Sequence, residues 1–241
     1  MATKYKKIGI LGGMGPVATA YFYGLLLKEM QEQYHTVQDT DYPPLVLYSL
    51  PLTGFDETGI IDENLVLQQL QGGIQILEQA HCDFIVIPCN TVHYFIEALR
   101  MKTKMPILSI IEETVQVVAQ ESPASVGLLA SETTFKEQLY HQALGEDIKI
   151  MAPDSESHQK ITALILKVMG GKDHVEAKKE VIAIMKKMEG DVDAYIVGCT
   201  ELSVVLSEND IDIKIYDPLK ILAKATVKHA IIEEPLVPIL V

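Results

Sequence analysis

Two stretches of the sequence share one pattern: Phe84-Ile-Val-Ile-Pro-Cys89-Asn-Thr and Ala194-Tyr-Ile-Val-Gly-Cys199-Thr-Glu. Each begins with apolar residues rich in β-branched and aromatic side chains, which is typical of a buried parallel strand. Each cysteine stands where the strand stops and residues suited to capping a helix begin. In open α/β sheets ligands bind at this edge, and a helix N-terminus favours a thiolate. The pattern therefore predicts a pair of acid/base thiols.

The surroundings of the two cysteines repeat as well. Lys7-Ile-Gly-Ile-Leu-Gly-Gly13 resembles Ser125-Val-Gly-Leu-Leu-Ala-Ser131, and both read as strands that end in small or hydroxylated residues. After each cysteine come a helix and a further short strand, Pro106–Ser109 in the first half and Lys214–Asp217 in the second. We interpret this as one βα unit used twice. Two such halves facing each other would place the cysteines on opposite walls of one cleft.

Strands and helices alternate along almost the whole chain, which predicts the α/β class with parallel sheets. The expected strands are 7–12, 45–50, 84–88, 106–110, 125–130, 147–151, 193–198 and 213–216. Apolar residues at helical spacing predict helices over 18–30, 63–79, 91–101, 112–120, 134–144, 157–169 and 174–188. One long irregular loop, 52–59, follows a strand and is expected near the ligand edge as a lid.

Composition narrows the classes of partner. The chain has 241 residues, 48% of them apolar, and a formal net charge of −13, with no lysine stripe interleaved with aromatics. These features exclude nucleic acid and an acidic membrane surface as expected partners, and leave small molecules. No long apolar segment appears, so the expected location is the cytoplasm. Three cysteines form no disulfide framework, and Cys82, before its strand, is read as an inert apolar residue.

A glycine loop follows the first strand. Gly13-Met-Gly15-Pro-Val-Ala18 matches the dinucleotide fingerprint in spacing, but the second strand ends in Pro51-Leu-Thr53 without the acidic residue that would hold a ribose. The loop is better read as approaching a small ligand, with Met14 among the residues that contact it. The seven histidines do not fall at metal-ligand spacing, so we expect no metal.

Three motifs together carry a resemblance to a known family. Gly12-Gly-Met-Gly-Pro-Val-Ala-Thr19, Pro88-Cys-Asn-Thr-Val-His93 and Gly198-Cys-Thr-Glu-Leu202 are similar to the signatures of the aspartate/glutamate racemases that use no cofactor. The resemblance implies two pseudo-symmetric α/β domains with the active site in the cleft between them. It implies a first domain of residues 1–113 plus 219–241 and a second of 114–218, with the helix near 221–232 packed on the first domain. It also implies a homodimer.

The resemblance further implies racemisation of an amino acid by two bases, without pyridoxal phosphate. Inverting an α-carbon requires removing a proton from one face and delivering one to the other, so a thiolate and a thiol must flank the carbon. Cys89 and Cys199 would fill these roles, Cys89 deprotonating the D-enantiomer and Cys199 the L-enantiomer.

Residues next to the cysteines are candidates for binding the substrate and stabilising the charge that grows on its α-carboxylate. They are Asn90, Thr91, Ser131, Thr134 and Thr200. Glu201 is a candidate for tuning Cys199, at a place where glutamate racemases carry a histidine, and His93 for acting likewise on Cys89. Each also has a purely structural reading: the hydroxyls and the amide as helix caps, Glu201 as a first-turn carboxylate and His93 as a helix residue.

The substrate-specificity loop departs from the family. Aspartate-type members carry Asp-Arg-Thr there, and this chain has Asp56-Glu57-Thr58. Arg100, the single arginine, falls elsewhere, and Lys167 resembles the family's other cationic contact. Aspartate or glutamate is the default substrate, but Glu57 would repel an acidic side chain and favours a neutral or cationic one.

Other functions stay open from the sequence. Related two-cysteine sites isomerise maleate or racemise hydantoins, and a degenerate member would only bind a ligand. A redox dithiol is a further alternative, although no Cys-x-x-Cys spacing supports it.

Overall fold

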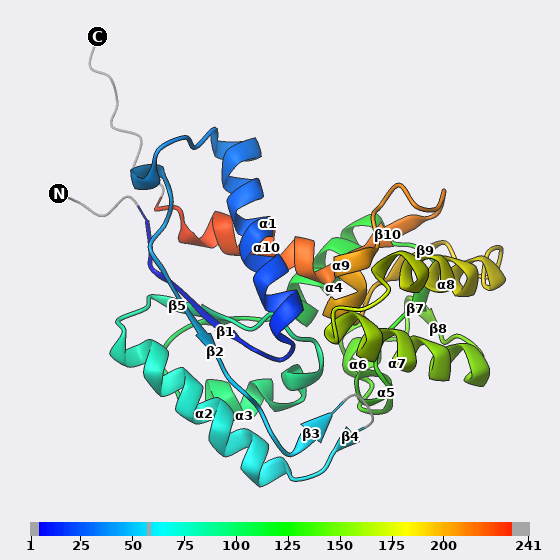
Figure 1. Cartoon of the computed structure of the whole chain (residues 1–241), viewed down its shortest axis with the longest axis horizontal. Helices are drawn as coiled ribbons and strands as arrows, with labels where there is room; N and C mark the ends of the chain where they lie inside the picture. The colour runs from blue at the N-terminus through cyan, green and yellow to red at the C-terminus, as the bar shows by residue number, and fades with distance from the viewer. Residues whose placement is uncertain (1–4, 57–58, 233–241) are drawn as a thin grey trace.

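A computed structural model describes residues 5–56 and 59–232. Two four-stranded parallel sheets dominate it (Figure 1). Their strand orders are β2-β1-β5-β6 and β8-β7-β9-β10, so every strand of the first sheet has a counterpart at the same place in the second. The cysteine strands β5 and β9 are both interior. The predicted α/β fold with two pseudo-symmetric parallel sheets is confirmed.

The strands of the first sheet are β1 (Ile8–Gly12), β2 (Leu45–Ser49), β5 (Phe84–Val86) and β6 (Ile107–Leu108). Those of the second are β7 (Ser125–Leu128), β8 (Lys149–Met151), β9 (Ala194–Ile196) and β10 (Lys214–Tyr216). The first half also holds α1 (Pro16–Tyr34), α2 (Glu63–Gln79), α3 (Ile96–Arg100), α4 (Ile110–Glu121) and the 3₁₀ helices η1 (Asp39–Asp41) and η2 (Thr91–Phe95). The second holds α5 (Glu132–Lys136), α6 (Leu139–Leu144), α7 (Ser155–Met169), α8 (His174–Lys187), α9 (Thr200–Val205) and α10 (Pro218–Ala230).

Alternation along the strands divides the apolar side chains between two faces of each sheet. In β5, Phe84 and Val86 belong to a central cluster, whereas Ile85 faces an outer cluster covered by α2 and α3. In the second sheet the outer cluster is covered by α7 and α8. The central cluster draws buried residues from both sheets and from α1, α4 and α10. The two halves therefore share one core.

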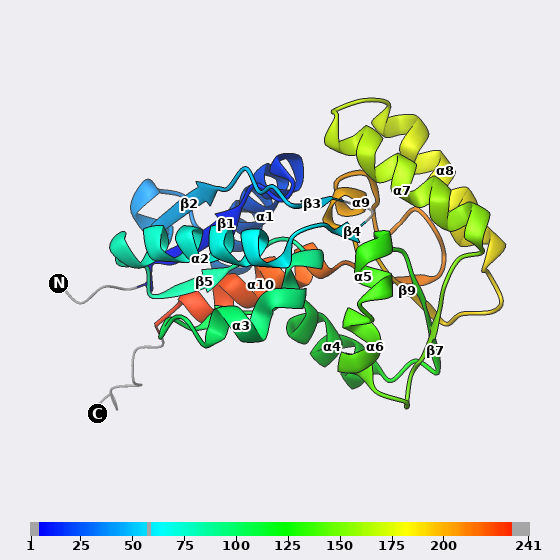
Figure 2. The ribbon, with the colours of Figure 1, turned by 90° about the horizontal axis from the view of Figure 1, so that it is seen from below.

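The last helix crosses back to the first half. Figures 1 and 2 show α10 running from β10 toward β5, where it packs against α1 and α4. At the C-terminal end of α10, the backbone N–H of Lys6 donates to Ala230 O at 2.7 Å. The α4 helix, which follows the first sheet, packs against α6 of the second half. Where one domain ends and the next begins stays a prediction, because the helices connecting the halves belong to a shared core.

Two expected helices differ in form. The helix expected over 91–101 begins as the 3₁₀ helix η2 before α3, and the one expected over 134–144 is divided into α5 and α6 at Gln138, whose φ is 54°. The expected loop 52–59 includes β3 (Phe55–Asp56), which pairs with β4 (Gly59–Ile60) as an antiparallel hairpin. Thr133 Oγ1 of the second half donates to Asp56 O at 3.5 Å. Glu57 and Thr58 lie outside the described residues.

In the part of the chain that the structure describes, no helix is both long and apolar enough to cross a membrane.

Candidate active site

Both cysteines stand at the ends of their strands, as expected. Cys89 follows a tight turn in which its backbone N–H donates to Ile87 O at 2.8 Å, and η2 begins two residues later. Cys199 is the N-cap of α9 and has an extended backbone conformation. Each cysteine is only 6% exposed. The structure therefore holds two enclosed thiols at matching places in the two halves.

A group of three hydroxyls joins the first cysteine turn to the second half. Thr91 Oγ1 lies 3.2 Å from Ser131 Oγ and 3.0 Å from Thr134 Oγ1. The Ser131 hydroxyl also caps α5 by accepting from the Thr134 backbone N–H at 3.3 Å. All three side chains are buried. The capping role proposed from the sequence is present for Ser131, and the same hydroxyls meet across the two halves.

Asn90, next to Cys89, also reaches the second half. The Tyr140 hydroxyl donates to Asn90 Oδ1 at 2.7 Å, and both residues are buried. The other end of the amide, Nδ2, is buried and has no hydrogen-bond partner among the described residues. A buried amide donor without a partner is uncommon in folded proteins, so Nδ2 is a candidate for contact with a ligand.

Glu201 connects the second cysteine turn to the glycine loop of the first half. The Cys199 thiol donates to Glu201 Oε2 at 3.1 Å, and the Thr200 hydroxyl donates to the same oxygen at 3.2 Å. The second carboxylate oxygen, Oε1, is buried without a partner in the described chain. A Cβ added to Gly15 would come within 2.6 Å of it. A side chain at position 15 would therefore have to displace the carboxylate end of Glu201.

The glycine loop is closed by Thr19 of α1. The Gly13 N–H donates to Thr19 Oγ1 at 2.9 Å, and the Thr19 hydroxyl donates to Gly15 O at 2.8 Å. Gly13 has a φ of 95°, and a Cβ there would lie 2.5 Å from Leu50 O, so the loop requires glycine at this position. Met14 is buried in the same apolar cluster as Cys89.

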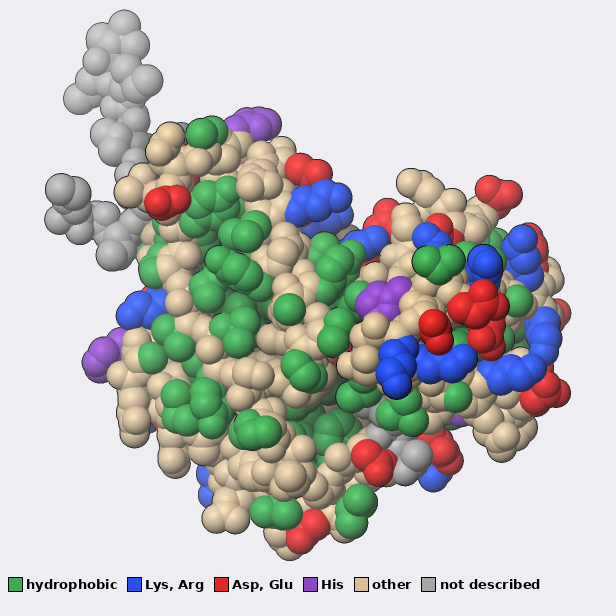
Figure 3. Space-filling model, in the orientation of Figure 1, with side chains coloured by type: hydrophobic (Ala, Val, Ile, Leu, Met, Phe, Trp, Pro, Cys, Tyr) green, Lys and Arg blue, Asp and Glu red, His purple; other side chains and the backbone are tan. Residues whose placement is uncertain are grey.

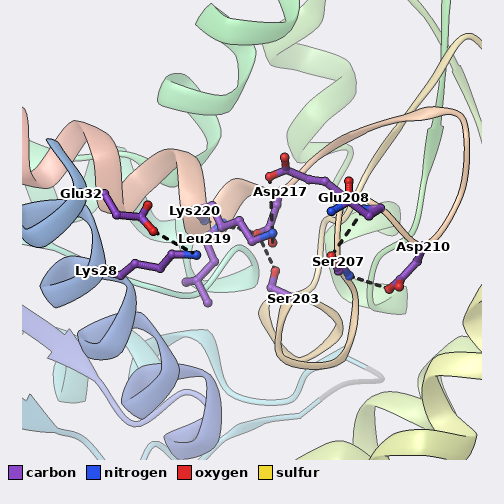
Figure 4. A network of polar contacts seen from close by, with 10 residues as sticks. Lys28, Glu32, Ser203, Ser207, Glu208, Asp210, Asp217, Leu219 and Lys220 are labelled. Carbon is purple, nitrogen blue, oxygen red and sulfur yellow. Dashed lines mark hydrogen bonds and ion pairs between the residues drawn. The ribbon is translucent and has the colours of Figure 1, made fainter.

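His93 and Ser203, each four residues after a cysteine, bind the N-terminus of the helix that follows the next strand. His93 Nδ1 lies 2.7 Å from Cys89 O, and its Nε2 accepts from the Ile110 N–H of α4 at 3.2 Å. The Ser203 hydroxyl donates at 2.8 Å to Asp217, the N-cap of α10 (Figure 4). Burial lowers the pKa of His93 to about 4. His93 is therefore neutral at pH 7, and its ring contacts the backbone of Cys89 and Ile110. This agrees with the structural role that the sequence left open for it.

Arg100, which the sequence places away from the site, and Lys167, the cationic candidate, are both engaged with carboxylates. Arg100 makes a bidentate contact with Glu112, at 2.6 and 2.7 Å, and also donates to Glu97. Lys167 is exposed on α7, with its Nζ 3.6 Å from Glu180 of α8. Its neighbours Leu164 and Val168 face the core, so helical periodicity turns Lys167 outward. The structure does not bring Lys167 together with the other candidates.

Cys82 differs from the other two cysteines. Its thiol is directed at Ile8 O, 3.8 Å away, and burial raises its pKa, which disfavours the thiolate. Within residues 5–56 and 59–232, no group of three or more His, Cys, Asp or Glu side chains is placed to hold a metal ion.

Tyr140, Ser203 and Asp217 were not found from the sequence. Tyr140 occupies an apolar position of an expected helix, where an aromatic residue normally signals core. A tyrosine hydroxyl buried among apolar residues needs a hydrogen-bond partner. That requirement is the one feature of the sequence that pointed to a polar contact of Tyr140.

Together, the two turns and the two post-strand loops form a crossed arrangement. The Cys89 turn contacts the loop after β7, through Thr91 and Ser131, and the Cys199 turn approaches the loop after β1, through Glu201 and Gly15. Such a site has a thiol from each half, buried hydroxyl and amide donors, and a carboxylate beside one thiol. It can move protons to and from a small polar molecule.

Comparisons with known proteins agree with this chemistry. A family model described as Asp/Glu/Hydantoin racemase matches residues 11–226. The broad specificity amino-acid racemase RacX of Bacillus subtilis (strain 168) is 31% identical over 222 residues, which is 91% of this chain and 96% of RacX. Picrophilus torridus aspartate racemase has a similar structure, with a TM-score of 0.81 and 29% sequence identity over 92% of this chain and 93% of that one.

A more distant structure shows the same fold. Glutamate racemase from Francisella tularensis subsp. tularensis, solved in complex with D-glutamate, has a TM-score of 0.64 and 14% identity over 92% of this chain and 80% of that one. The family match spans nearly the whole chain, and it includes both cysteine turns and the glycine loop. The chain therefore belongs to the Asp/Glu/Hydantoin racemase family and is a racemase, which is a type of isomerase.

Proposed function

We propose that this chain is an amino-acid racemase in which Cys89 and Cys199 act as the two bases. The observation that carries the proposal is the crossed arrangement of the turns: each cysteine is enclosed and follows an equivalent strand, and each turn reaches the loop of the opposite half. Two thiols supplied from opposite halves suit an α-carbon that must be approached from both faces.

The proposed reaction is a proton transfer on each face of the substrate. The Cys89 thiolate takes the α-proton and becomes a thiol, while the Cys199 thiol gives its proton to the opposite face and becomes a thiolate. The reverse reaction exchanges the roles. The hydrogen bond from Cys199 to Glu201 supports this starting state, because a carboxylate 3.1 Å away favours the protonated thiol over a second negative charge.

Charge on the α-carboxylate grows as the α-proton leaves, so donors must already be in place. In the proposal these are Asn90 Nδ2 and the hydroxyls of Thr91, Ser131, Thr134 and Thr200. Their support is burial: donors in a site closed to water act more strongly than exposed ones. The substrate ammonium group would face Glu201 Oε1, and Met14 would contact the substrate from the glycine loop. The reaction as proposed uses no pyridoxal phosphate and no metal.

Aspartate or glutamate is the first substrate to test, since relatives with those names share the fold. A neutral or basic amino acid is the alternative. Its support is the engagement of Arg100 with Glu112 and of Lys167 with Glu180, which leaves neither as a counter-ion for an acidic side chain. The similarity to a racemase named for broad specificity points the same way.

Two broader proposals concern the whole protein. We propose a homodimer, supported by hydrophobic side chains that gather over the half carrying β1 and β2, whereas charged side chains dominate the other half (Figure 3). We propose a cytoplasmic location, where buried cysteines such as these stay reduced; cell fractionation followed by detection of the protein tests it.

The deciding experiment is proton NMR of the reduced protein in D₂O, following loss of the α-proton signal across a panel of L- and D-amino acids. Exchange of one or a few amino acids is expected from the wild type, and none from Cys89→Ala or Cys199→Ala. The matched control is Cys82→Ala, which removes an equally buried thiol and should exchange normally. Silence of the wild type across the panel, or full activity of either cysteine variant, rules out the two-base racemase.

A further inference from the structure

Tyr140 lies between the two cysteine turns and belongs to neither. It is on α6, is fully buried, and is part of the central core shared by the two halves. Its hydroxyl donates to Asn90 Oδ1, the residue after Cys89. Its ring faces Gly198, the residue before Cys199, where an added Cβ would lie 3.4 Å from the ring. One side chain therefore hydrogen-bonds the residue after Cys89 and faces the residue before Cys199.

The hydrogen bond determines which way the Asn90 amide points. The two ends of an amide side chain have similar size and opposite hydrogen-bonding character. Because Tyr140 donates at 2.7 Å, the oxygen must face Tyr140 and the NH₂ group must face away. That NH₂ group is the buried donor that has no partner within the described residues. Reversing the amide would require the Tyr140 hydroxyl to accept from the NH₂ group instead of donating, and would turn an acceptor oxygen toward the other side.

We propose that Tyr140 is a positioning residue that fixes the Asn90 amide so that Nδ2 is presented to the substrate's α-carboxylate. This inference rests on the proposed racemase function, because it assigns Nδ2 to the carboxylate of that substrate. Asn90 contacts the substrate in this scheme, and Tyr140 acts through Asn90.

The surroundings keep Tyr140 a donor. Burial raises its pKa well above the usual range, and this effect outweighs a hydrogen bond with Thr114 that lowers the pKa. The charge of Asp217, and that of Cys199 when it is a thiolate, raises the pKa further. The hydroxyl therefore stays protonated across the pH range in which a racemase works. When Cys199 becomes a thiolate during turnover, its charge favours the same protonated state, so the orientation of Asn90 does not change between the two forms of the enzyme.

A double-mutant cycle tests the proposal with an amino acid that the exchange panel identifies. Asn90→Ala removes a donor to developing charge and should lower kcat by about 10²-fold. Tyr140→Phe keeps the Asn90 amide but no longer fixes which way it points. It should lower kcat about tenfold in both directions of racemisation. In the double variant, Tyr140→Phe should cause no further loss, because its effect passes through Asn90. A purely structural role would give multiplicative losses.

Tyr195→Phe is the matched control. Tyr195 is equally buried and its hydroxyl donates at 2.5 Å to Met185 O, in the outer cluster of the second half. The variant loses the same oxygen and a hydrogen bond of the same kind, and should keep the wild-type kcat and KM. Wild-type kinetics in Tyr140→Phe, or an equal loss of kcat in Tyr195→Phe, overturns the proposal.

Asn90→Asp tests the orientation without altering Tyr140. The aspartate keeps an acceptor for the Tyr140 hydroxyl and replaces the NH₂ group by oxygen, so it should be no more active than Asn90→Ala. Wild-type activity in Asn90→Asp overturns the assignment of Nδ2 as the working end. This variant keeps the assignment of Nδ2 open to disproof even where Tyr140→Phe fails to fold.

Side-chain amide NMR separates this proposal from the function on which it rests. In ¹⁵N-labelled protein, the Asn90 NH₂ signals, identified by their loss in Asn90→Asp, should be sharp in the wild type and broadened or doubled in Tyr140→Phe. If the wild type is silent in the exchange panel, the racemase function fails, and these signals still test the positioning. Identical sharp signals in both proteins overturn it.

Discussion

His93 is one turn from Cys89, yet its ring is fully engaged with the backbone. The Ile110 N–H donates to Nε2, so Nε2 carries no proton and Nδ1–H donates to Cys89 O. The neutral imidazole thus ties the Cys89 turn to the start of α4. Protonation would place a second N–H against the Ile110 N–H, in a site closed to water, and this explains why burial lowers its pKa to about 4.

The same pKa predicts acid sensitivity. The unfolded chain binds a proton at His93 near pH 6.5, whereas the native protein binds it only near pH 4. The contribution of His93 to stability is therefore complete above pH 6.5 and is lost progressively as the pH falls toward 4. Between pH 7.5 and 4.5 the free energy of unfolding should fall by about 2–3 kcal/mol on account of this residue.

Urea unfolding of the wild type and His93→Gln at the two pH values measures this contribution. Other buried groups titrate in both proteins and cancel in the difference. The wild type should lose more stability on acidification than His93→Gln does. Equal losses in the two proteins would show that folding does not lower the pKa of His93.

The sequence identified site residues that stand directly after a strand. It did not identify residues whose role depends on a contact with a distant part of the chain. Thr91, Ser131 and Thr134 were candidates because each follows a strand, and the structure brings their hydroxyls together. Tyr140 was not found because its partner is 50 positions away and its helix pattern reads as core. Whether Lys167 points toward the site or toward solvent depends on which face of α7 packs on the core, and the structure buries the face that carries Leu164 and Val168.

The repeated βα unit is the element that the sequence predicted best. Continuous apolar runs and the matching post-strand residues predicted two similar halves, and the structure gives their two sheets the same strand order. The division of one expected helix at Gln138 was not predictable from apolar spacing, because that spacing continues from α5 into α6. The β3–β4 hairpin was missed since each strand is only two residues long.

The N-terminus of α10 provides a prediction at this scale. Asp217 Oδ1 accepts from the N–H groups of Leu219 and Lys220 and from the Ser203 hydroxyl, at 3.0, 3.3 and 2.8 Å. Asp217→Ala removes the cap and leaves a buried hydroxyl unpaired, so the free energy of unfolding should fall by about 2–4 kcal/mol. Asp217→Asn keeps an oxygen acceptor and should cost less.

Denaturant unfolding of the three proteins measures the difference. Asp154→Ala is the control, because Asp154 caps α7 in the same way but at an exposed site, and its loss should be smaller. If Asp217→Ala were no less stable than Asp154→Ala, the Asp217 contacts would contribute no more than an exposed cap.

In the whole molecule, the segments that connect the two halves are helices packed in the shared core. The proposed site between the halves is therefore bounded by two parts that are held together. The α4 helix packs against the second half and α10 against the first, so each crossing of the chain buries apolar side chains. The two halves that carry the thiols are thereby joined by one core, while Cys89 and Cys199 themselves pack in the outer cluster of their own half. The boundaries of the two domains stay a prediction, since a crossing helix contributes to both.

The apolar surface of the first half carries the last prediction. Edge strand β2 and helix α1 expose Leu47 and Tyr23, at 37% and 40% of their surface. Unpaired strand edges and apolar side chains favour association, and we expect a second copy of the chain to cover them.

Sedimentation should give twice the 26.7 kDa of one chain, and Leu47→Glu should give the monomer. Val175→Glu, which changes an exposed residue of α8 in the other half, should leave the dimer intact. A wild-type mass of one chain would exclude the homodimer, whereas a dimer that tolerates Leu47→Glu would place the contact on another face.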